Sequence, residues 1–218
     1  MVVHGGGALI TQWLQVHQIP SRFVRGLRVT DQESLAVVIA VLAGLVNKEL
    51  VASLQGVGAR AAGFSGVDGG LVRGRVLDQE LGLVGVSASI DLTLVKAVRN
   101  AGFMPVIAPV GLGEPGTLNF NADTFAGDLA AEMGADLLIF LTDVPGVLGP
   151  DGVVRSTLDA GQARELIEAG IASGGMIPKL NACLRARDEG TECWIVDGRE
   201  EHALLRALSE HPVGTRLL

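Results

Sequence analysis

The sequence Asn-Phe-Asn-Ala-Asp at residues 119–123 and the apolar run Leu-Leu-Ile-Phe-Leu at residues 137–141 decide the fold that we expect. Asparagine and aspartate favour helix starts over strands, so the first stretch predicts a loop that enters a helix over residues 122–133. The apolar run is short and continuous, as in a parallel strand buried on both faces, and Thr142 and Asp143 mark its polar carboxyl end. Ligands of open α/β sheets bind at such strand ends.

Short apolar stretches alternate with helix-like segments along the rest of the chain. This alternation predicts an α/β fold, a three-layer αβα sandwich with a mainly parallel open sheet. Thr30 and Glu33 are spaced as a capping box for a helix through the apolar residues 35–46. The other expected elements are strands at residues 59–64, 104–109, 192–196 and near 216, helices at 91–100, 158–168 and 201–210, and hairpins at 66–86, with the strand at 104–109 leading straight to the loop at Asn119.

Composition excludes several classes of protein. The 218 residues predict one large domain or two small ones, and the net charge of -7 without a basic block argues against a nucleic-acid binder. Cys183 and Cys193, the two cysteines, exclude a disulfide framework and a cysteine zinc site, fit a reducing cytoplasm, and are expected to be buried thiols. The apolar stretch at residues 35–46 is too short to span a bilayer, which predicts a buried helix and no membrane partner.

A first glycine loop, His-Gly-Gly-Gly at residues 4–7, follows Val2-Val3 and precedes a helix-like segment. Backbone N–H groups of Gly6 and Gly7 at a helix start are suited to an anion, although a plain tight turn fits the same residues. The loop lacks the Lys-Ser/Thr ending of a P-loop. An esterase is rejected because the chain has no Gly-x-Ser-x-Gly elbow.

Three further groups of residues each have a functional and a structural interpretation. Arg28, just before a helix, would fork onto a carboxylate, or else lie on the surface as a solvated arginine. Lys179 follows Gly-Gly in the first turn of a predicted helix, where a cation is unfavourable unless an anion binds there too, and the alternative is a surface lysine. Asn121 and Asp123 would otherwise serve only as helix caps.

Five blocks in this order resemble the acetylglutamate kinases of the amino acid kinase family, and they span nearly the whole chain. They are residues 4–7 (His-Gly-Gly-Gly), 26–31 (Gly-Leu-Arg-Val-Thr-Asp), 119–123 (Asn-Phe-Asn-Ala-Asp), 141–147 (Leu-Thr-Asp-Val-Pro-Gly-Val) and 174–179 (Gly-Gly-Met-Ile-Pro-Lys). The resemblance implies ATP-dependent phosphorylation of the side-chain carboxylate of N-acetyl-L-glutamate to an acyl phosphate, in the arginine biosynthesis of the cytoplasm. It also implies a homo-oligomer such as a dimer.

The resemblance assigns a role to each matching residue. The single domain would have an acid-binding half, about residues 1–118, and a nucleotide-binding half, about residues 119–218. Lys179 would stabilise charge on the leaving phosphate, and Asp123 would orient the catalytic lysines. The acid substrate would contact Gly6, Gly7, Arg28, Asn119 and Asn121, and the adenine nucleotide would contact Asp143, Val144, Pro145, Gly146, Val147, Leu148, Ile171, Ala172 and Ser173.

The chemistry of this reaction fits the residues that are present. A carboxylate nucleophile is ionised at neutral pH and needs no general base, so the protein need only position the reactants and neutralise charge. The expected cofactors are ATP and Mg²⁺. We expect the ATP phosphates to hold most of the Mg²⁺ coordination shell and the protein to supply no dedicated metal ligands.

The first residues depart from the family pattern. Family members begin with a strand carrying Lys-x-Gly-Gly and then a helix, whereas this chain starts at Met1-Val2-Val3. We therefore expect upstream sequence to be missing and activity to be lowered, by about a hundred- to a thousandfold for one lost charge donor. Two alternatives stay open: a non-catalytic form that binds a nucleotide or metabolite, and a kinase for a related acid such as a carrier-linked aminoadipate.

Overall fold

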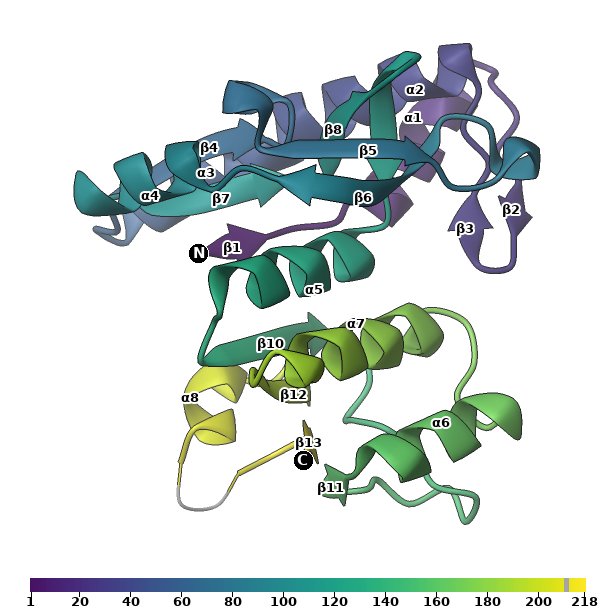
Figure 1. Cartoon of the computed structure of the whole chain (residues 1–218), viewed down its shortest axis with the longest axis vertical. Coiled ribbons are helices and arrows are strands. Elements are labelled where there is room, and N and C mark those ends of the chain that lie inside the picture. Colours follow the sequence, from purple (N-terminus) through teal and green to yellow (C-terminus); the bar gives the residue numbers. More distant parts are fainter. Residues whose placement is uncertain (210–211) are drawn as a thin grey trace. The chain divides into compact units, whose positions relative to one another are not determined.

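The computed structural model describes residues 1–209 and 212–218, and the chain divides into two compact units, Met1–Phe125 and Ala126–Leu218 (Figure 1). Each unit contains parallel strand pairs joined through helices. The predicted α/β class with a parallel sheet is therefore confirmed. The glycine loop and Arg28 belong to the first unit, and Lys179 belongs to the second.

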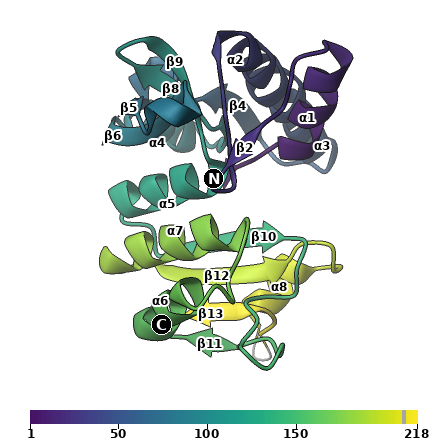
Figure 2. The same cartoon turned by 90° about the vertical axis from the view of Figure 1, so that its right-hand side faces the viewer.

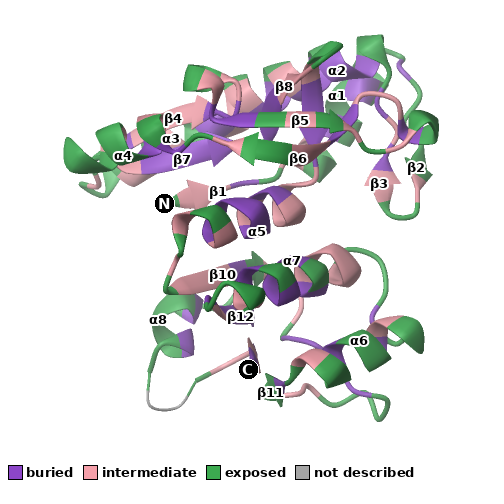
Figure 3. Ribbon diagram, in the orientation of Figure 1, coloured by how far each residue is buried: buried purple, intermediate pink, exposed green. Residues whose placement is uncertain are grey.

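The first unit is built on a parallel sheet of β1 (Val2–Val3), β7 (Met104–Ala108) and β4 (Ala61–Ser65), in the order β1-β7-β4. Most of β7 is buried (Figure 3). Helix α1 (Gly7–Val16) and the following long helix pack in one apolar cluster with the end of this sheet. The strand predicted at residues 104–109 is confirmed and anchors the unit.

The long helix consists of α2 (Gln32–Ile39), the π-helical segment η1 (Ala40–Val46) and α3 (Asn47–Gly56). By length and composition alone, this helix of 25 residues could cross a membrane. The expectation that the apolar stretch is too short to do so counted only residues 35–46, which are part of this longer helix. Its inner side chains, among them Val38 and Val41, are fully buried beside α1, as in a core helix.

The predicted cap of this helix is wrong in one respect. Asp31, not Thr30, caps α2, because its Oδ1 accepts a hydrogen bond of 2.8 Å from the Ser34 N–H. Thr30 is fully buried, and its hydroxyl forms hydrogen bonds elsewhere. An aspartate and a threonine at adjacent positions both satisfy the cap pattern, and only the tertiary contacts of Thr30 decide between them.

Four strands close into a small barrel in the first unit: β5 (Val72–Val76), β6 (Val84–Ile90), β9 (Gly116–Phe120) and β8 (Val110–Gly113). The hairpins predicted at residues 66–86 correspond to the antiparallel pair β5–β6 and the short turns around it, but the β8–β9 hairpin was not predicted. The chain therefore does not run straight from β7 to Asn119. The remaining elements of this unit are β2 (Phe23–Val24), β3 (Leu27–Arg28), α4 (Thr93–Asn100), η2 (Asp68–Gly70) and η3 (Gln79–Leu81).

The barrel interior is filled by Phe120, for which several glycines leave room. A Cβ atom on Gly85 would lie 2.6 Å from Phe120 Cζ. Phe120 itself is buried. A methyl group at this position therefore cannot be accommodated without moving the ring.

We expect Gly85→Ala to lower the free energy of unfolding by about 1–3 kcal/mol because it overpacks the barrel. Urea unfolding followed by circular dichroism measures the change. Gly44→Ala is the matched control, because a Cβ there meets no atom within 4 Å, so its stability should be unchanged or slightly raised. An equal loss of stability in both variants would refute the proposed role of Gly85.

The second unit is built on a four-stranded sheet in the order β10 (Leu137–Thr142), β12 (Glu192–Asp197), β13 (Thr215–Leu217) and β11 (Thr157–Leu158), which Figure 2 shows from top to bottom. Cys193 and Ile195 of β12 join the cluster of α6 (Ala160–Glu168) and α7 (Met176–Asp188). The alternate residues Trp194 and Val196 join Ala207 of α8 (Ala203–Ala207). Helices therefore cover both faces of this sheet, and the predicted buried cysteines are confirmed.

The stretches that decided the predicted fold are largely confirmed. Helix α5 spans Ala122–Met133, as predicted, and β10 covers the apolar run at residues 137–141. Asn119 lies in strand β9 and not in a loop, so that expectation is wrong. β10 is only partly buried, since Leu141 is 56% exposed. Leu158 belongs to β11 and not to α6, and Glu210, the predicted end of the helix at residues 201–210, lies outside the described residues.

Candidate functional site

The glycine loop joins β1 to α1. Gly6 is the N-cap of α1, and the helix has neither a side-chain cap nor an acidic residue in its first turn. A Cβ on Gly6 would lie 2.8 Å from Leu42 Cδ2, so glycine permits the close approach of the loop to the long helix. The N–H groups of the first turn of a helix lack intrahelical acceptors, and here they remain available for an anion.

A buried network of polar side chains stabilises the glycine loop. His4 Nδ1 lies 3.0 Å from Gly5 O, and His4 Nε2 lies 3.1 Å from Asn47 Nδ2. Asn47 is fully buried and also donates to Val106 O at 3.0 Å. Because an amide nitrogen only donates, Nε2 must accept, so His4 is neutral and its Nδ1–H donates to the loop. Burial, reinforced by the charge of Lys48, lowers the pKa of His4.

This network predicts a pH dependence of stability. The pKa of His4 is lower in the folded chain than its ordinary value of 6.5, so below pH 6.5 the unfolded chain takes up the proton more readily. The contribution is fully present above pH 6.5 and is lost as the pH falls. Between pH 7.5 and 5.5 we expect the unfolding free energy to fall by up to about 1.4 kcal/mol more in the wild type than in His4→Gln. Urea titrations at both pH values measure it, and equal pH slopes in the two proteins would contradict it.

Arg28 lies in β3 and is buried, so it is neither in a loop nor a solvated surface residue. Its Nη2 donates to Gly7 O at 2.9 Å and to Thr11 Oγ1 at 2.7 Å, and its Nη1 donates to Ser21 Oγ. Its guanidinium carbon also lies 4.6 Å from the centre of the Phe23 ring. Burial lowers the pKa of Arg28, and within residues 1–209 and 212–218 no carboxylate pairs with it. A buried cation with only neutral partners is a favourable place for an anionic ligand.

Asn119 and Asn121 have different surroundings. Asn119 is mostly buried, and its Nδ2 donates to Thr30 Oγ1 at 3.0 Å. Asn121 Oδ1 accepts from the N–H of Thr124 at 3.0 Å, so its oxygen caps α5, as its structural interpretation predicted. Asp123 lies in the first turn of the same helix and is half-buried.

In the second unit, the segment from Asp143 to Leu148 follows the carboxyl end of β10. Its buried Val147 donates its N–H to Thr215 Oγ1 at 2.8 Å, which fixes the segment to β13. Gly146 has a φ of 151°, and a Cβ there would lie 2.7 Å from Thr215 Oγ1. Sequence reasoning missed Thr215, because its partner lies 68 residues away. The exposed members of the segment are Asp143, Pro145 and Leu148, and Val144 is half-buried.

The second glycine segment leads into α7. The Ala172 N–H donates to Leu166 O at 2.9 Å, which fixes the stretch of Ile171, Ala172 and Ser173 on α6. Helix α7 starts after Gly175 and, like α1, has neither a side-chain cap nor an acidic residue in its first turn. Lys179 follows in this first part of the helix and is half-buried. Helix α7 thus offers a positive N-terminus with a lysine beside it.

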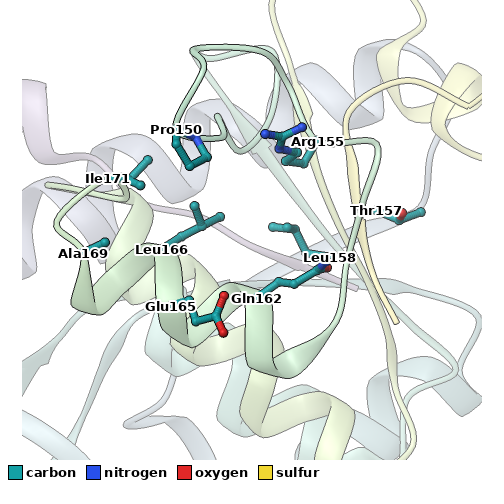
Figure 4. A pocket seen from close by; sticks show the side chains of 9 residues that line it. All are labelled: Pro150, Arg155, Thr157, Leu158, Gln162, Glu165, Leu166, Ala169 and Ile171. Atoms are coloured by element: carbon teal, nitrogen blue, oxygen red, sulfur yellow. The ribbon is translucent and has the colours of Figure 1, made fainter.

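A pocket of about 390 Å³ lies next to this segment within the second unit (Figure 4). Of the predicted nucleotide-binding residues, only Ile171 lines it. The other lining residues are Pro150, Arg155, Thr157, Leu158, Gln162, Glu165, Leu166 and Ala169.

Comparison with known proteins shows which protein family the chain belongs to. The model of the amino acid kinase family matches residues 1–197. An acetylglutamate kinase of Dehalococcoides mccartyi is 42% identical over 99% of this chain and 82% of its own length. A crystal structure from Streptococcus mutans UA159 superposes with a TM-score of 0.88 at 28% identity, covering 100% of this chain and 84% of that one.

A second solved structure is similar to this chain over half of its own length. N-acetylglutamate synthase from Neisseria gonorrhoeae, solved with coenzyme A and N-acetyl-glutamate, gives a TM-score of 0.85 at 25% identity, over 98% of this chain and 50% of that one. The family model covers residues 1–197 of the 218, which is far more than half of the chain. The chain belongs to the amino acid kinase family.

Proposed function

We propose that the chain is an acetylglutamate kinase, which transfers the γ-phosphoryl group of ATP to the side-chain carboxylate of N-acetyl-L-glutamate in arginine biosynthesis. The observation that carries this proposal is the buried Arg28, whose guanidinium contacts only neutral groups among the described residues and is bonded to Gly7 at the uncapped start of α1. One anionic end of the substrate would pair with Arg28, and the other would lie at the helix N-terminus. The curated relative at 42% identity carries the same name.

The roles of the other residues in the first unit follow from their positions. Arg28 would hold the α-carboxylate through its positive charge and through the guanidinium N–H groups left after its bonds to Gly7, Thr11 and Ser21. Gly6 and Gly7 would donate backbone N–H groups to the carboxylate that is phosphorylated and to the transferred phosphoryl group. Asn119 would bind another polar group of the substrate. Asn121 supports this side mainly by capping α5.

The second unit would bind the nucleotide. Lys179, with the N-terminus of α7, would stabilise the negative charge that develops on the leaving phosphate. Asp123, at the start of α5 in the first unit, would orient the catalytic lysines, as the family resemblance implies. The adenine nucleotide would contact the segment from Asp143 to Leu148 and the stretch from Ile171 to Ser173. We accordingly propose that the acid-binding half ends, and the nucleotide-binding half begins, near α5.

Magnesium fits this arrangement as part of the nucleotide. No group of three or more His, Cys, Asp or Glu side chains suited to a metal ion lies among the described residues. The uncapped N-termini of α1 and α7 suit phosphate oxygens, so the phosphates would carry Mg²⁺ and the chain would bind the phosphates. Bound Mg²⁺ would supply further neutralisation of phosphate charge.

No general base is required in this mechanism. The accepting carboxylate is ionised at neutral pH, so the work of the protein is to align it with the γ-phosphorus and to offset charge. Arg28 is immobilised by three neutral acceptors before the substrate arrives, which reduces the entropy lost on binding.

The proposed function is tested by trapping the acyl phosphate with hydroxylamine in the presence of MgATP. N-acetyl-L-glutamate is compared with N-acetyl-L-aspartate, L-glutamate and N-acetyl-L-2-aminoadipate. Turnover selective for N-acetyl-L-glutamate is expected. Selective turnover of the aminoadipate derivative would identify a kinase for that longer acid, and binding of N-acetyl-L-glutamate without turnover would identify a non-catalytic form.

We further propose a cytoplasmic homodimer, as the family resemblance implies. Size-exclusion chromatography with light scattering measures the mass of the assembly against the 22.6 kDa of one chain. A mass of about twice this value is expected, and the mass of a single chain at micromolar concentration would contradict the dimer.

A further inference from the structure

Resting on the proposed function, we propose that Thr30 is a positioning residue for the acid substrate, acting by fixing the side-chain amide of Asn119 relative to Arg28. Thr30 is fully buried, and its hydroxyl lies between the two residues. The Thr30 hydroxyl lies 3.1 Å from Arg28 O and 3.0 Å from Asn119 Nδ2. All of these atoms belong to the first unit.

The direction of each hydrogen bond follows from the groups involved. A backbone carbonyl only accepts, so the single hydroxyl proton of Thr30 is donated to Arg28 O. The hydroxyl oxygen must then receive its second bond from a donor, and the only donor on the Asn119 side chain is the amide nitrogen. The amide of Asn119 therefore points its nitrogen at Thr30 and its Oδ1 away. In the part of the chain that the structure describes, no group donates to Asn119 Oδ1.

Backbone hydrogen bonds through Leu83 also hold Thr30 and Asn119 next to each other. The Leu83 N–H donates to Thr30 O at 2.6 Å, and Leu83 O accepts from the Asn119 N–H at 2.9 Å. The N–H and the carbonyl of Leu83 thus link the two segments of the chain that carry Thr30 and Asn119. A Cβ on Gly82 would lie 2.4 Å from Thr30 O, so the approach requires glycine at that position. With the backbone fixed, the hydroxyl of Thr30 decides the orientation of the amide.

Arg28 is joined to the same arrangement through its own carbonyl. Its backbone carbonyl accepts a hydrogen bond from the Thr30 hydroxyl, and its side chain donates hydrogen bonds to Gly7 and Thr11 of α1. We infer that these bonds fix the position of the acceptor Asn119 Oδ1 relative to the guanidinium of Arg28. A ligand with a carboxylate and a neighbouring N–H donor, such as an N-acylated amino acid, satisfies both.

The test compares Thr30→Val, which removes the hydroxyl at nearly constant shape, with Thr30→Ser, which keeps it. We expect Thr30→Val to raise the KM and the calorimetric Kd for N-acetyl-L-glutamate about tenfold, the value of one well-made hydrogen bond. The kcat and the KM for ATP should stay within about twofold of wild type. Thr30→Ser should restore the acid KM to within about threefold.

Asn119→Ala shows whether Thr30 acts through Asn119. If it does, adding Thr30→Val to Asn119→Ala should change the acid KM by less than about twofold, because coupled residues are not additive. An unchanged acid KM in Thr30→Val, a fall in kcat alone, or a full tenfold effect in the Asn119→Ala background would each overturn the inference. Failure of wild type to bind N-acetyl-L-glutamate would overturn the proposed function and the inference with it, whereas normal binding insensitive to Thr30 would overturn only the inference.

Discussion

Replacing Arg28 by lysine should weaken the binding of N-acetyl-L-glutamate by about a hundredfold or more, as expected when one partner of a buried hydrogen-bonded charge pair is lost. Lysine keeps the charge, but its three N–H donors cannot bond Gly7 O, Thr11 Oγ1 and Ser21 Oγ and still leave one for a carboxylate, whereas the five donors of arginine can. The effect should appear in the calorimetric Kd and in the KM for the acid, with the KM for ATP changed little.

Arg25→Lys is the matched control for this prediction. Arg25 lies between β2 and β3, in the same hairpin, but is exposed and pairs with Asp78 and Glu80 on the surface. An exposed pair contributes little, so this variant should bind the acid within about twofold of wild type. If Arg28→Lys behaved like Arg25→Lys, Arg28 would not contact the substrate.

Lys179→Ala should lower kcat by about a hundred- to a thousandfold, the usual loss when one charge donor to a transition state is removed. The KM for N-acetyl-L-glutamate should change by no more than a few fold, because the acid is assigned to the first unit. Single-turnover measurement of acyl-phosphate formation separates this chemical step from product release.

Lys96→Ala controls for the loss of a lysine as such. Lys96 is exposed on α4, and kcat in this variant should equal that of wild type within error. Thermal unfolding of both variants shows whether the fold survives. A folded Lys179→Ala protein with normal kcat would exclude Lys179 from the mechanism.

Much of the fold followed from local sequence, and the exceptions share one cause. The helix at residues 122–133 and the strand at 137–141 are set by near neighbours, and both were predicted. Asn119 was expected in a loop because asparagine is a poor strand former. It lies in β9 because its N–H pairs with Leu83 O and its side chain with Thr30, partners distant in sequence that no local pattern reveals.

The candidate site was predictable in its residue types but not in its contacts. Arg28 was predicted to be a carboxylate ligand, but its hydrogen bonds to Ser21 and to Gly7 and Thr11 of α1 could not be read from local sequence. His4 and Asn47, which are distant in sequence, support the glycine loop. Thr215 likewise supports the segment after β10 through Val147. The ligand contacts and catalytic roles assigned to all of the site residues, in the first unit as in the second, remain predictions.

We propose that Arg28 selects an N-acylated acid by its α-carboxylate and so determines which acid is phosphorylated on its side chain. The most direct test is the ratio of kcat/KM for N-acetyl-L-glutamate to that for its α-carboxamide, which keeps the reacting side-chain carboxylate. We predict that wild type prefers the α-carboxylate by about a hundredfold or more and that Arg28→Ala loses most of this preference. Equal kcat/KM values for the two compounds with wild type would contradict the account.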